Sequence, residues 1–443
     1  MGEGGMGEGG AVTTIVIKGG TVVDQTGTRR ADVLVSDEGT VVAVGEGLDG
    51  DRTLDATDCV VSPGFVDLHV HLRQPGKEEA ETIETGARGA ALGGFTSVIA
   101  MPNTTPAMDC AAVVREVIDL AAETICDVRP SAAITVGRDG ESLTPMAELV
   151  KLGVRIFTDD GTGVQDARLM RTALEYAGSL THLSGGQPIV LAQHCEVSAL
   201  SEGTAMHEGA WSSRLGIPGQ PAEAEELMVM RDIALARLTG TRVHFQHMST
   251  AGSVAMIRAA KAAGLPVTAE AATHHFCLTD ACCADYDPVF KVHPPLRTDA
   301  DVAAVKEGLA DGTIDAIATD HAPHTPQDKE RTFADAPPGM LGLETAFAVA
   351  NTHLGLPIER LLAALSWRPA AIAGLQADHG GPIVEGAAAN LAIVDPDTTW
   401  TVSGEAMASR SRNTPYEGMT VRGRVRHTVL RGEPVVIDGE AQR

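Results

Sequence analysis

Eight short apolar runs, most of them separated by Ala-rich stretches, fill the middle of the chain and constrain its fold more than any other feature. The runs are GFVDLHVH, TSVIAMPN, RPSAAITVG, VRIFTDDG, PIVLAQHCE, RVHFQHMS, PVTAEAATHH and DAIATDHAPH. Consecutive apolar residues are typical of parallel strands that are buried on both faces. Residues 222–239 place four apolar side chains at helical spacing and predict a helix: Leu227, Met230, Ala234 and Leu238. Eight strands alternating with helices predict an α/β fold, a (β/α)8 TIM barrel, with a doubly wound sheet as the alternative.

Polar side chains come where these predicted strands end, and they favour the barrel. The positions are His69, His71, Asn103, Asp160, His194, His247 and Asp320. In a barrel, the carboxyl ends of the strands meet at one mouth, where active sites lie. Burying so many polar groups without a use would be costly. We therefore expect one functional site at that mouth.

Both ends of the chain carry short β-like runs that are separated by Gly and Pro. Near the start, TTIVIKGGTVV, ADVLVSDEG and TVVAVG predict hairpins in an antiparallel sheet. Similar runs return near the end of the chain. We expect a small β-sandwich formed by residues 13–60 and 381–443, a barrel over 61–380, and a flexible Gly-rich segment at 1–12.

His69 and His71 are the first candidates for metal ligands. Residues two apart on a strand share a face, so both imidazoles can point into the barrel mouth, and neutral imidazole is a common metal ligand. An isolated HxH pair is equally compatible with packing, but the His and Asp residues at later strand ends favour a metal. Asp320 can bind a metal and accept a proton from its bound water.

Two other pairs leave a choice open. Asp159 and Asp160 are adjacent, so only one of them can face the barrel lumen, and either alone is compatible with a turn or a helix cap. His244 and His247 are three residues apart and face opposite sides of a strand. We therefore expect one of these two histidines to be structural.

Charge and cysteine content exclude several classes of protein. Lys and Arg total 34 against 59 Asp and Glu, which gives a formal net charge of −25. So acidic a chain disfavours binding to nucleic acid or to anionic membranes. We see no secretory signal, membrane span, Walker loop or GxSxG elbow. The seven cysteines are scattered and odd in number, which fits a reducing compartment. We expect a cytoplasmic enzyme with a small-molecule substrate.

Several longer blocks closely resemble bacterial type I dihydroorotases of the amidohydrolase superfamily, over nearly the whole chain after residue 12. They include DLHVHLRQPG (67–76), FTDDG (157–161), KVHPPLR (291–297) and DGTIDAIATDHAPH (311–324), of which the HVHLRQPG and DGTIDAIATDHAPH blocks are highly specific. The resemblance implies a metal-bearing barrel with a small β-sandwich. It also implies reversible, zinc-dependent hydrolysis of L-dihydroorotate to N-carbamoyl-L-aspartate in pyrimidine biosynthesis.

The resemblance also implies roles for individual residues. Asp320 transfers protons during catalysis. One or two zinc ions are bound by His69, His71, Asp160, His194, His247 and Asp320. The substrate is bound by His71, Arg73, Asn103, His293, His324, Pro338 and Gly339. His293 departs from the family pattern KxNPPLR, which has Asn at this position, and some relatives have Phe in place of Pro338.

Alternatives to this function come from the same superfamily. A hydantoinase or allantoinase would share the chemistry, but Arg73 and Asn103 favour dihydroorotate because a guanidinium gives its carboxylate a charged, forked partner. A catalytically inactive subunit that scaffolds aspartate transcarbamoylase is disfavoured, because all six ligand positions are present. We expect a homo-oligomer, and association with aspartate transcarbamoylase stays open.

Overall fold

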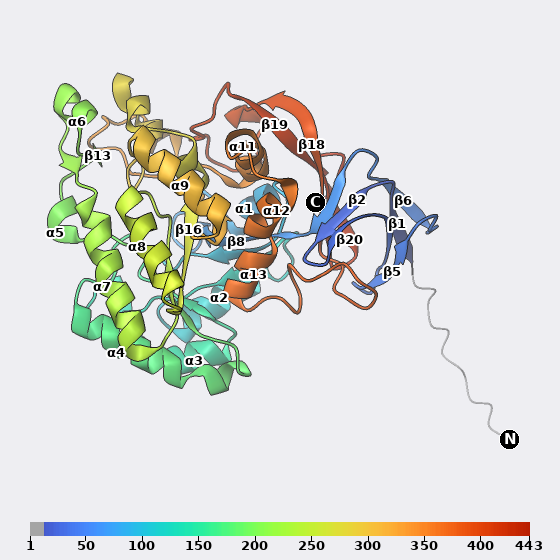
Figure 1. The fold of residues 1–443 in the computed structure, drawn as a ribbon, viewed down its shortest axis with the longest axis horizontal. Coiled ribbons are helices and arrows are strands. Elements are labelled where there is room, and N and C mark those ends of the chain that lie inside the picture. Colours follow the sequence, from blue (N-terminus) through green and yellow to red (C-terminus); the bar gives the residue numbers. More distant parts are fainter. Residues whose placement is uncertain (1–12) are drawn as a thin grey trace.

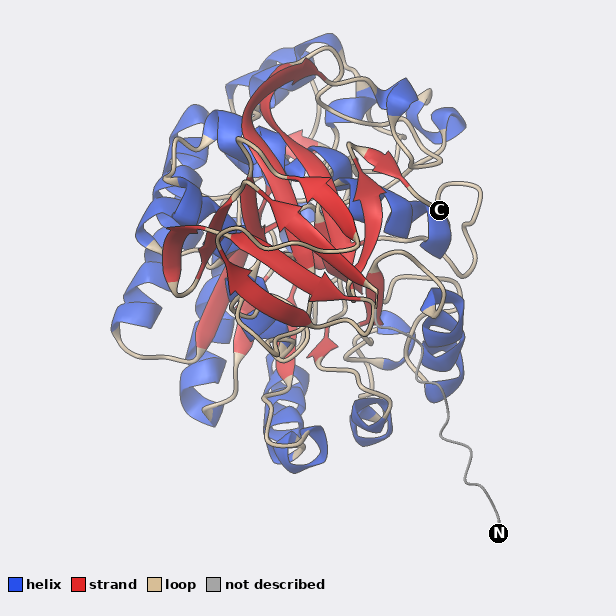
Figure 2. Cartoon of the chain, turned by 90° about the vertical axis from the view of Figure 1, so that its right-hand side faces the viewer, coloured by secondary structure: helices blue, strands red, loops and turns tan. Residues whose placement is uncertain are grey.

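The structure is a computed structural model that describes residues 13–443, and it has the predicted mixed α/β fold (Figure 1). The predicted flexible segment 1–12 lies outside the described residues. Strands from the middle of the chain lie in one half of the molecule, surrounded by helices. Strands from both ends of the chain form the other half (Figures 1 and 2).

Apart from a separate two-stranded sheet of β13 (Met206–His207) and β14 (Gly219–Gln220), the middle of the chain forms two wholly parallel sheets, with strand orders β10-β9-β8 and β11-β12-β15-β16-β17. Their strands are β8 (Phe65–Val70), β9 (Phe95–Ala100), β10 (Asp127–Pro130), β11 (Ile156–Phe157), β12 (Val190–Gln193), β15 (Val243–Phe245), β16 (Val267–Ala272) and β17 (Ala316–Ala318). Parallel bridges from Ala132 to Phe157 and from Val70 to His321 join the edges of the two sheets. The carboxyl ends of all these strands therefore lie on one side.

Helices cover the outside of these sheets (Figure 2). The α-helices of the described chain are α1 (Ile83–Leu92), α2 (Ala111–Ala121), α3 (Met146–Lys151), α4 (Ala167–Ser179), α5 (Ser198–Ser201), α6 (Ala210–Leu215), α7 (Glu223–Thr239), α8 (Ala251–Ala262), α9 (Asp299–Asp311), α10 (Pro326–Lys329), α11 (Ala346–His353), α12 (Ile358–Leu365) and α13 (Trp367–Ala373). No helix within residues 13–443 is long and apolar enough to cross a membrane.

Local sequence sets where several of these helices begin and end. Thr82, Thr250 and Thr298 precede α1, α8 and α9, and each side chain accepts a hydrogen bond from a backbone N–H of the first turn. Helices α7 and α9 end at Gly240 and Gly312, which both have positive φ. These stops fix the lengths of the loops that return the chain to the next strand.

The strand predicted for RPSAAITVG is largely wrong, because β10 ends at Pro130 and most of that run follows it as a loop. The backbone N–H groups of Ile134 and Thr135 donate to the Asp159 carboxylate, at 2.8 and 3.0 Å, instead of to a neighbouring strand. A side chain thus replaces the strand ladder there.

The two ends of the chain form a four-stranded sheet, β5-β4-β1-β6, and a seven-stranded sheet, β21-β20-β19-β18-β7-β2-β3. The strands are β1 (Thr14–Lys18), β2 (Thr21–Asp24), β3 (Gly27–Arg30), β4 (Asp32–Ser36), β5 (Val41–Gly45), β6 (Arg52–Asp55), β7 (Val60–Pro63), β18 (Leu391–Thr401), β19 (Thr420–Leu430), β20 (Glu433–Ile437) and β21 (Glu440–Ala441). One buried apolar cluster contains residues of both sheets, including Ile17 and Val33 from the first and Val61 and Ile393 from the second. The two sheets therefore share a core.

The prediction that TTIVIKGGTVV forms a hairpin is wrong. Its two halves are β1 and β2, which belong to different sheets and pair in parallel with β6 and β7, respectively. The turn between them is Gly19-Gly20. Gly19 has a φ of +84°, and a Cβ on Gly20 would lie 2.7 Å from Val61, so the chain crosses between sheets where only glycine fits.

The helix predicted over 222–239 is confirmed as α7, but its apolar stripe faces outward. Leu227, Met230 and Leu238 are 44%, 55% and 60% exposed. The opposite face is buried and includes Glu225 and Asp232. These acids can be buried because Glu225 accepts hydrogen bonds from the segment before α8 and Asp232 pairs with Arg231 at 2.8 Å.

Candidate metal centre and active site

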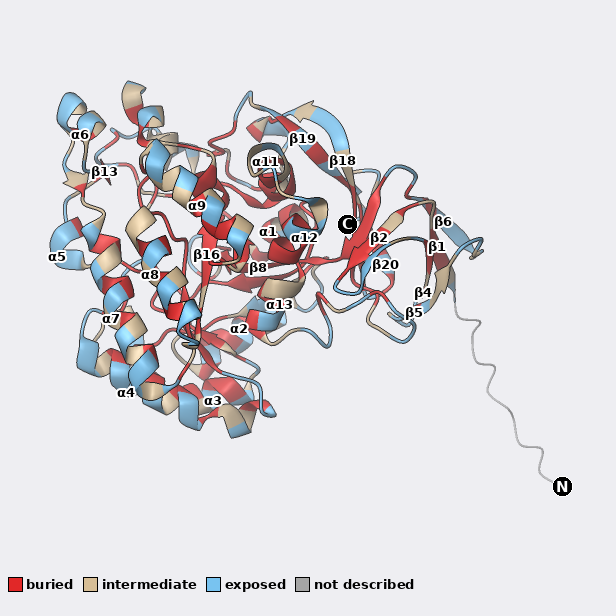
Figure 3. Cartoon of the chain, viewed as in Figure 1, coloured by how far each residue is buried: buried red, intermediate tan, exposed pale blue. Residues whose placement is uncertain are grey.

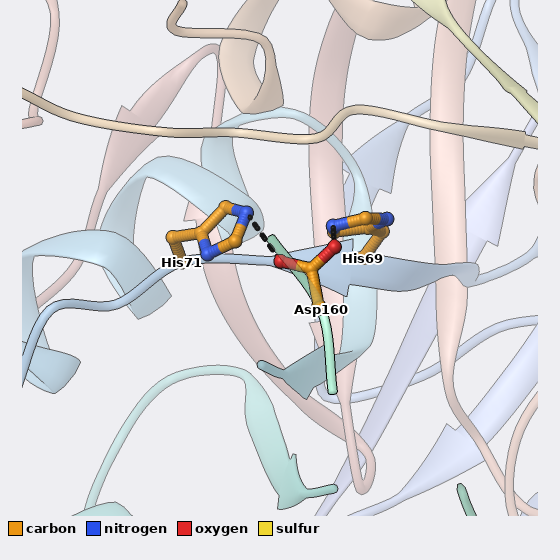
Figure 4. Close-up of side chains that lie close together, drawn as sticks. All are labelled: His69, His71 and Asp160. Carbon is orange, nitrogen blue, oxygen red and sulfur yellow. Dashed lines mark ion pairs between the residues drawn. The ribbon is translucent and has the colours of Figure 1, made fainter. Parts of the chain in front are cut away.

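Two histidines and an aspartate form the first of two buried groups. His69 belongs to β8, His71 follows that strand by one residue, and Asp160 follows β11. The Asp160 carboxylate lies between the two rings (Figure 4). Its Oδ1 is 3.3 Å from His69 Nε2, and its Oδ2 is 3.5 Å from His71 Nε2.

Asp160 also belongs to the second group, with His194 after β12 and His247 after β15. Asp160 Oδ1 is 3.3 Å from His194 Nδ1 and 3.8 Å from His247 Nε2. The two imidazole nitrogens are 2.8 Å apart. In each group, the candidate ligand atoms lie within 4.8 Å of one another. One carboxylate therefore connects two adjoining positions that can each hold a metal ion.

Asp320 follows β17 and adjoins the first group. Its Oδ1 is 3.1 Å from His71 Nε2 and 3.5 Å from His69 Nε2. Burial alone would raise the pKa of Asp320, but the charge of His69 and the hydrogen bond with His71 outweigh it and hold that pKa well below its usual range. The carboxylate is thus available in its charged form.

The orientation of the imidazole rings fits a metal. His69 donates from Nδ1 to Glu270 at 2.8 Å, and His71 donates from Nδ1 to Asn103 at 2.9 Å. Both rings therefore present Nε2 to the carboxylates. His69 Nε2 is buried and has no hydrogen-bond partner in the described part of the chain. Imidazole and carboxylate groups in this number suit zinc or a similar divalent cation.

Glu270 is a functional candidate that sequence reasoning missed. It lies in β16, is fully buried, and also accepts a hydrogen bond from His244 Nε2 at 2.9 Å. Burial opposes its ionisation, but the hydrogen bonds from His244 and His69 lower the pKa of Glu270 to about 2. A charged residue within the apolar run PVTAEAA was the available signal, since a buried carboxylate needs a partner.

The structure decides between the members of the two pairs that the sequence left open, Asp159 with Asp160 and His244 with His247. Asp160 belongs to both groups that could hold a metal ion, whereas Asp159 accepts backbone hydrogen bonds from the loop after β10. His247 is part of the second group, whereas His244 bonds Glu270 and Thr268. His244 therefore has the structural role that strand geometry predicted for one of these two histidines.

A pocket of about 150 Å³ opens over this centre. Every residue that was predicted to bind the substrate lines it: His71, Arg73, Asn103, His293, His324, Pro338 and Gly339. Five of the six predicted metal ligands also line it: His71, Asp160, His194, His247 and Asp320. The sixth, His69, does not line the pocket but contacts Asp160 and Asp320. The structure therefore brings together all the candidate residues.

The Arg73 guanidinium is held in place by uncharged partners, so no carboxylate neutralises its charge. Its Nε donates to the carbonyl of Pro323 at 3.0 Å, and its Nη2 is 3.3 Å from His324 Nε2. No ion pair joins Arg73 to a carboxylate within residues 13–443, including the nearby acids Glu78 and Glu79. A guanidinium in this state suits an anionic ligand group.

The other side of the pocket is a loop that Asn413 holds in place. Its Nδ2 donates to the carbonyls of Ala322 and Gly339, at 3.0 and 3.1 Å, and its Oδ1 accepts from His324 N. His324 Nε2 donates to the Pro338 carbonyl at 2.8 Å. Asn413, which the sequence did not single out, therefore orders this wall of the pocket.

Backbone strain concentrates at the site. Arg73, His247 and Asp320 have positive φ values of 60°, 36° and 47°. Non-glycine residues rarely adopt this conformation, which costs roughly 1–3 kcal/mol each. Such strain persists where the surroundings fix a side chain, and here it directs three candidate residues toward one pocket.

The solved structures that this fold resembles include hydantoinases and dihydropyrimidinases. The L-hydantoinase (dihydropyrimidinase) from Arthrobacter aurescens superposes with a TM-score of 0.86 at 25% identity, covering 97% of this chain and 98% of that one. Fold and pocket together define a class, the metal-dependent cyclic amide hydrolases.

Sequence relatives define the family within that class. A dihydroorotase from Streptomyces coelicolor is 46% identical over 435 residues, covering 96% of this chain and 99% of the relative. A dihydroorotase from Mycobacterium leprae is 47% identical over 420 residues, covering 91% and 94%. The family model described as dihydro-orotase-like matches residues 58–253. The chain belongs to the dihydroorotase family.

Proposed function

We propose that this protein is a zinc-dependent dihydroorotase, which reversibly opens the cyclic amide of L-dihydroorotate to N-carbamoyl-L-aspartate in pyrimidine biosynthesis. The observation that carries the proposal is a free guanidinium, Arg73, in the same pocket as two histidine groups that share Asp160. The pocket thus combines a metal centre with a partner for the substrate carboxylate.

The proposal includes the architecture that positions the site. Two parallel sheets whose edges are joined by bridges support a closed (β/α)8 barrel over residues 61–380. The two sheets with a shared core support a β-sandwich domain of residues 13–60 and 381–443. The active site then lies at the carboxyl ends of the barrel strands, where this fold carries its catalytic groups.

The metal ligands follow from the two groups. One ion would be held by His69, His71 and Asp320, and a second by His194 and His247, with Asp160 shared between them. A bound zinc ion lowers the pKa of water to about 7 and polarises a carbonyl oxygen. Glu270 and Asn103 fix the tautomers of His69 and His71, as outer partners of metal-bound histidines do.

The remaining residues bind the substrate and move protons. Asp320 takes a proton from the attacking water and gives it to the ring nitrogen that leaves, and the same group acts in reverse during ring closure. Arg73 and Asn103 bind the substrate carboxylate, Arg73 through two parallel hydrogen bonds. His293, His324 and the Pro338–Gly339 backbone complete the wall around the ring.

Removal of metal is expected to abolish turnover while the fold persists. The large apolar core contains none of the proposed metal ligands, so we expect it to form without the ion, unlike the core of a zinc finger. The test is chelation followed by dihydroorotate hydrolysis and far-UV circular dichroism on one sample, with zinc added back as the control. Full turnover in a sample shown to be metal-free would refute the proposed mechanism.

Glu270→Gln is expected to weaken metal binding by about 10–100-fold, because the neutral amide no longer fixes His69 as a charged acceptor. Competition with a chromophoric chelator measures this affinity independently of catalysis. Glu344→Gln is the matched control, since Glu344 is a largely buried glutamate whose side chain bonds the backbone of Ala408. Equal metal affinities for both variants and the parent would contradict a positioning role for Glu270.

A further inference from the structure

Arg297 is one of the largest fully buried side chains of the described chain, and none of the substrate or metal roles proposed above involves it. It ends the block KVHPPLR and is 1% exposed. Burying a guanidinium is costly unless hydrogen bonds satisfy its N–H groups. Arg297 donates from Nε to the Ser249 hydroxyl at 3.2 Å and from Nη1 to the Gln220 carbonyl at 3.0 Å. These two partners lie on separate segments of the chain.

The first of these segments is the turn after His247, a histidine of the second group. Ser249 Oγ accepts the hydrogen bond from Arg297 and donates one to Glu225, which lies on the buried face of α7 (Figure 3). Glu225 also accepts from the backbone N–H groups of Ser249 and Thr250, at 3.2 and 3.1 Å. His247 has a positive φ of 36°, a conformation that persists only where the surroundings fix it. The bonds to Glu225 fix the turn directly after this residue.

The second segment leads to His194, the other histidine of the second group. Gln220 is the last residue of β14, and its side-chain Nε2 donates to the Glu196 carboxylate at 3.0 Å. The same carboxylate oxygen is 3.6 Å from His194 Nε2. The other ring nitrogen, Nδ1, is the one that lies 3.3 Å from Asp160. Glu196 therefore faces His194 from behind, where the outer partner of a metal-bound imidazole lies.

We infer that a hydrogen-bonded network centred on Arg297 positions both histidines of the second group for metal binding. The other members of this Arg297 network are Ser249, Glu225, Gln220 and Glu196. Glu196 fixes the ring of one histidine through a charged acceptor, and Glu225 fixes the turn that follows the other histidine. Arg297 joins the two branches. These are positioning roles, since no member of the network lines the pocket, and the inference rests on the proposed metal-dependent function.

The first group of metal ligands has different support. Its outer partners are Glu270 and Asn103, which bond His69 and His71 at 2.8 and 2.9 Å. Within residues 13–443, no member of the Arg297 network bonds either of these histidines. The two metal positions are therefore held by different parts of the chain. A substitution in the network is expected to weaken the binding of one ion and to leave the other ion bound as in the parent.

Zinc titration of the full chain in competition with a chromophoric chelator tests the inference, because it measures the affinity of each ion independently of catalysis. Glu196→Gln removes the charged acceptor behind His194 and is expected to weaken the binding of one ion by about 10–100-fold. Glu202→Gln is the matched control: Glu202 is an exposed glutamate nearby in sequence, and this variant is expected to bind both ions like the parent. Both variants are expected to keep the parent Tm without metal, which excludes misfolding as the cause.

Ser249→Ala tests the other branch of the network. It removes the hydroxyl that joins Arg297 to Glu225, whereas the backbone bonds to Glu225 remain. It is therefore expected to weaken the same ion by less than Glu196→Gln does. The double variant is expected to lose more affinity for that ion than either single variant and to bind the other ion with the affinity of the parent.

Three results would overturn the inference: a parent chain that binds a single zinc ion, unchanged affinities for both ions in Glu196→Gln, or equal weakening of both ions. Hydrolysis of dihydroorotate by the same samples separates these results from a failure of the proposed function. A parent that hydrolyses dihydroorotate while Glu196→Gln binds both ions normally would refute the network alone. A parent that binds two ions but does not hydrolyse dihydroorotate would refute the proposed function.

Discussion

Asp320→Asn is expected to lower kcat for L-dihydroorotate by about 10²–10⁴-fold, the usual contribution of a positioned proton-transfer group. The amide keeps the shape of the carboxylate but cannot take the proton of the attacking water. Asp320 is itself a proposed metal ligand and lies 3.1 Å from His71 Nε2, so the substitution also changes the proposed metal site. Zinc content must therefore be measured on the same sample, and kcat expressed per metal-loaded site.

His324→Ala is the comparison for this experiment. His324 lines the pocket, but its Nε2 bonds the Pro338 carbonyl and lies outside both metal groups. Its loss is expected to raise KM more than it lowers kcat. If metal-loaded Asp320→Asn turned over at a rate near that of the parent, another group would have to be the base.

Arg73→Met is expected to lower kcat/KM for dihydroorotate by about 30-fold to several-thousand-fold. Truncating one member of a buried charge pair costs about 2–5 kcal/mol, and about 1.4 kcal/mol corresponds to a factor of ten. Dihydrouracil lacks the ring carboxylate, so it should be a poor substrate for the parent and be little affected by the substitution. The measurement is kcat/KM for both substrates with both proteins.

Arg73→Lys refines the same test, because lysine keeps the charge but cannot make two parallel hydrogen bonds. It is expected to fall between the parent and Arg73→Met on dihydroorotate. Arg73 also donates a hydrogen bond to the Pro323 carbonyl at 3.0 Å. The competing explanation is therefore that Arg73 has only a structural role in the pocket. That explanation predicts that Arg73→Met slows both substrates equally.

The positions of the metal-site residues could be predicted because strand geometry is regular. Parallel strands bring their carboxyl ends to one edge, so His69, Asp160 and Asp320 were expected to meet although they are far apart in sequence. Alternation along a strand also predicted that one histidine of the 244 and 247 pair would be structural. Strand geometry alone could not decide which member of each pair faces the candidate metal centre, because that depends on where the strand ends.

The parts that were not predicted depend on contacts that form only in three dimensions. Glu270 bonds His69 across the fold, and Asn413 reaches the pocket wall from the far end of the chain. In the loop after β10, backbone N–H groups donate to the Asp159 carboxylate instead of to a neighbouring strand. The spacing of Leu227, Met230 and Leu238 correctly predicted a helix, but spacing alone does not show which face of the helix is buried. Here the face with Glu225 is buried, because hydrogen bonds satisfy its carboxylate.

The most direct measurement is the hydrolysis of L-dihydroorotate, followed by the loss of ring absorbance, by purified protein of known zinc content. The same preparation is assayed in parallel with hydantoin and dihydrouracil. We expect kcat/KM to be highest for dihydroorotate and to rise in proportion to the zinc bound. A preference for hydantoin or dihydrouracil, or turnover of dihydroorotate that does not depend on metal, would contradict the assignment of this pocket.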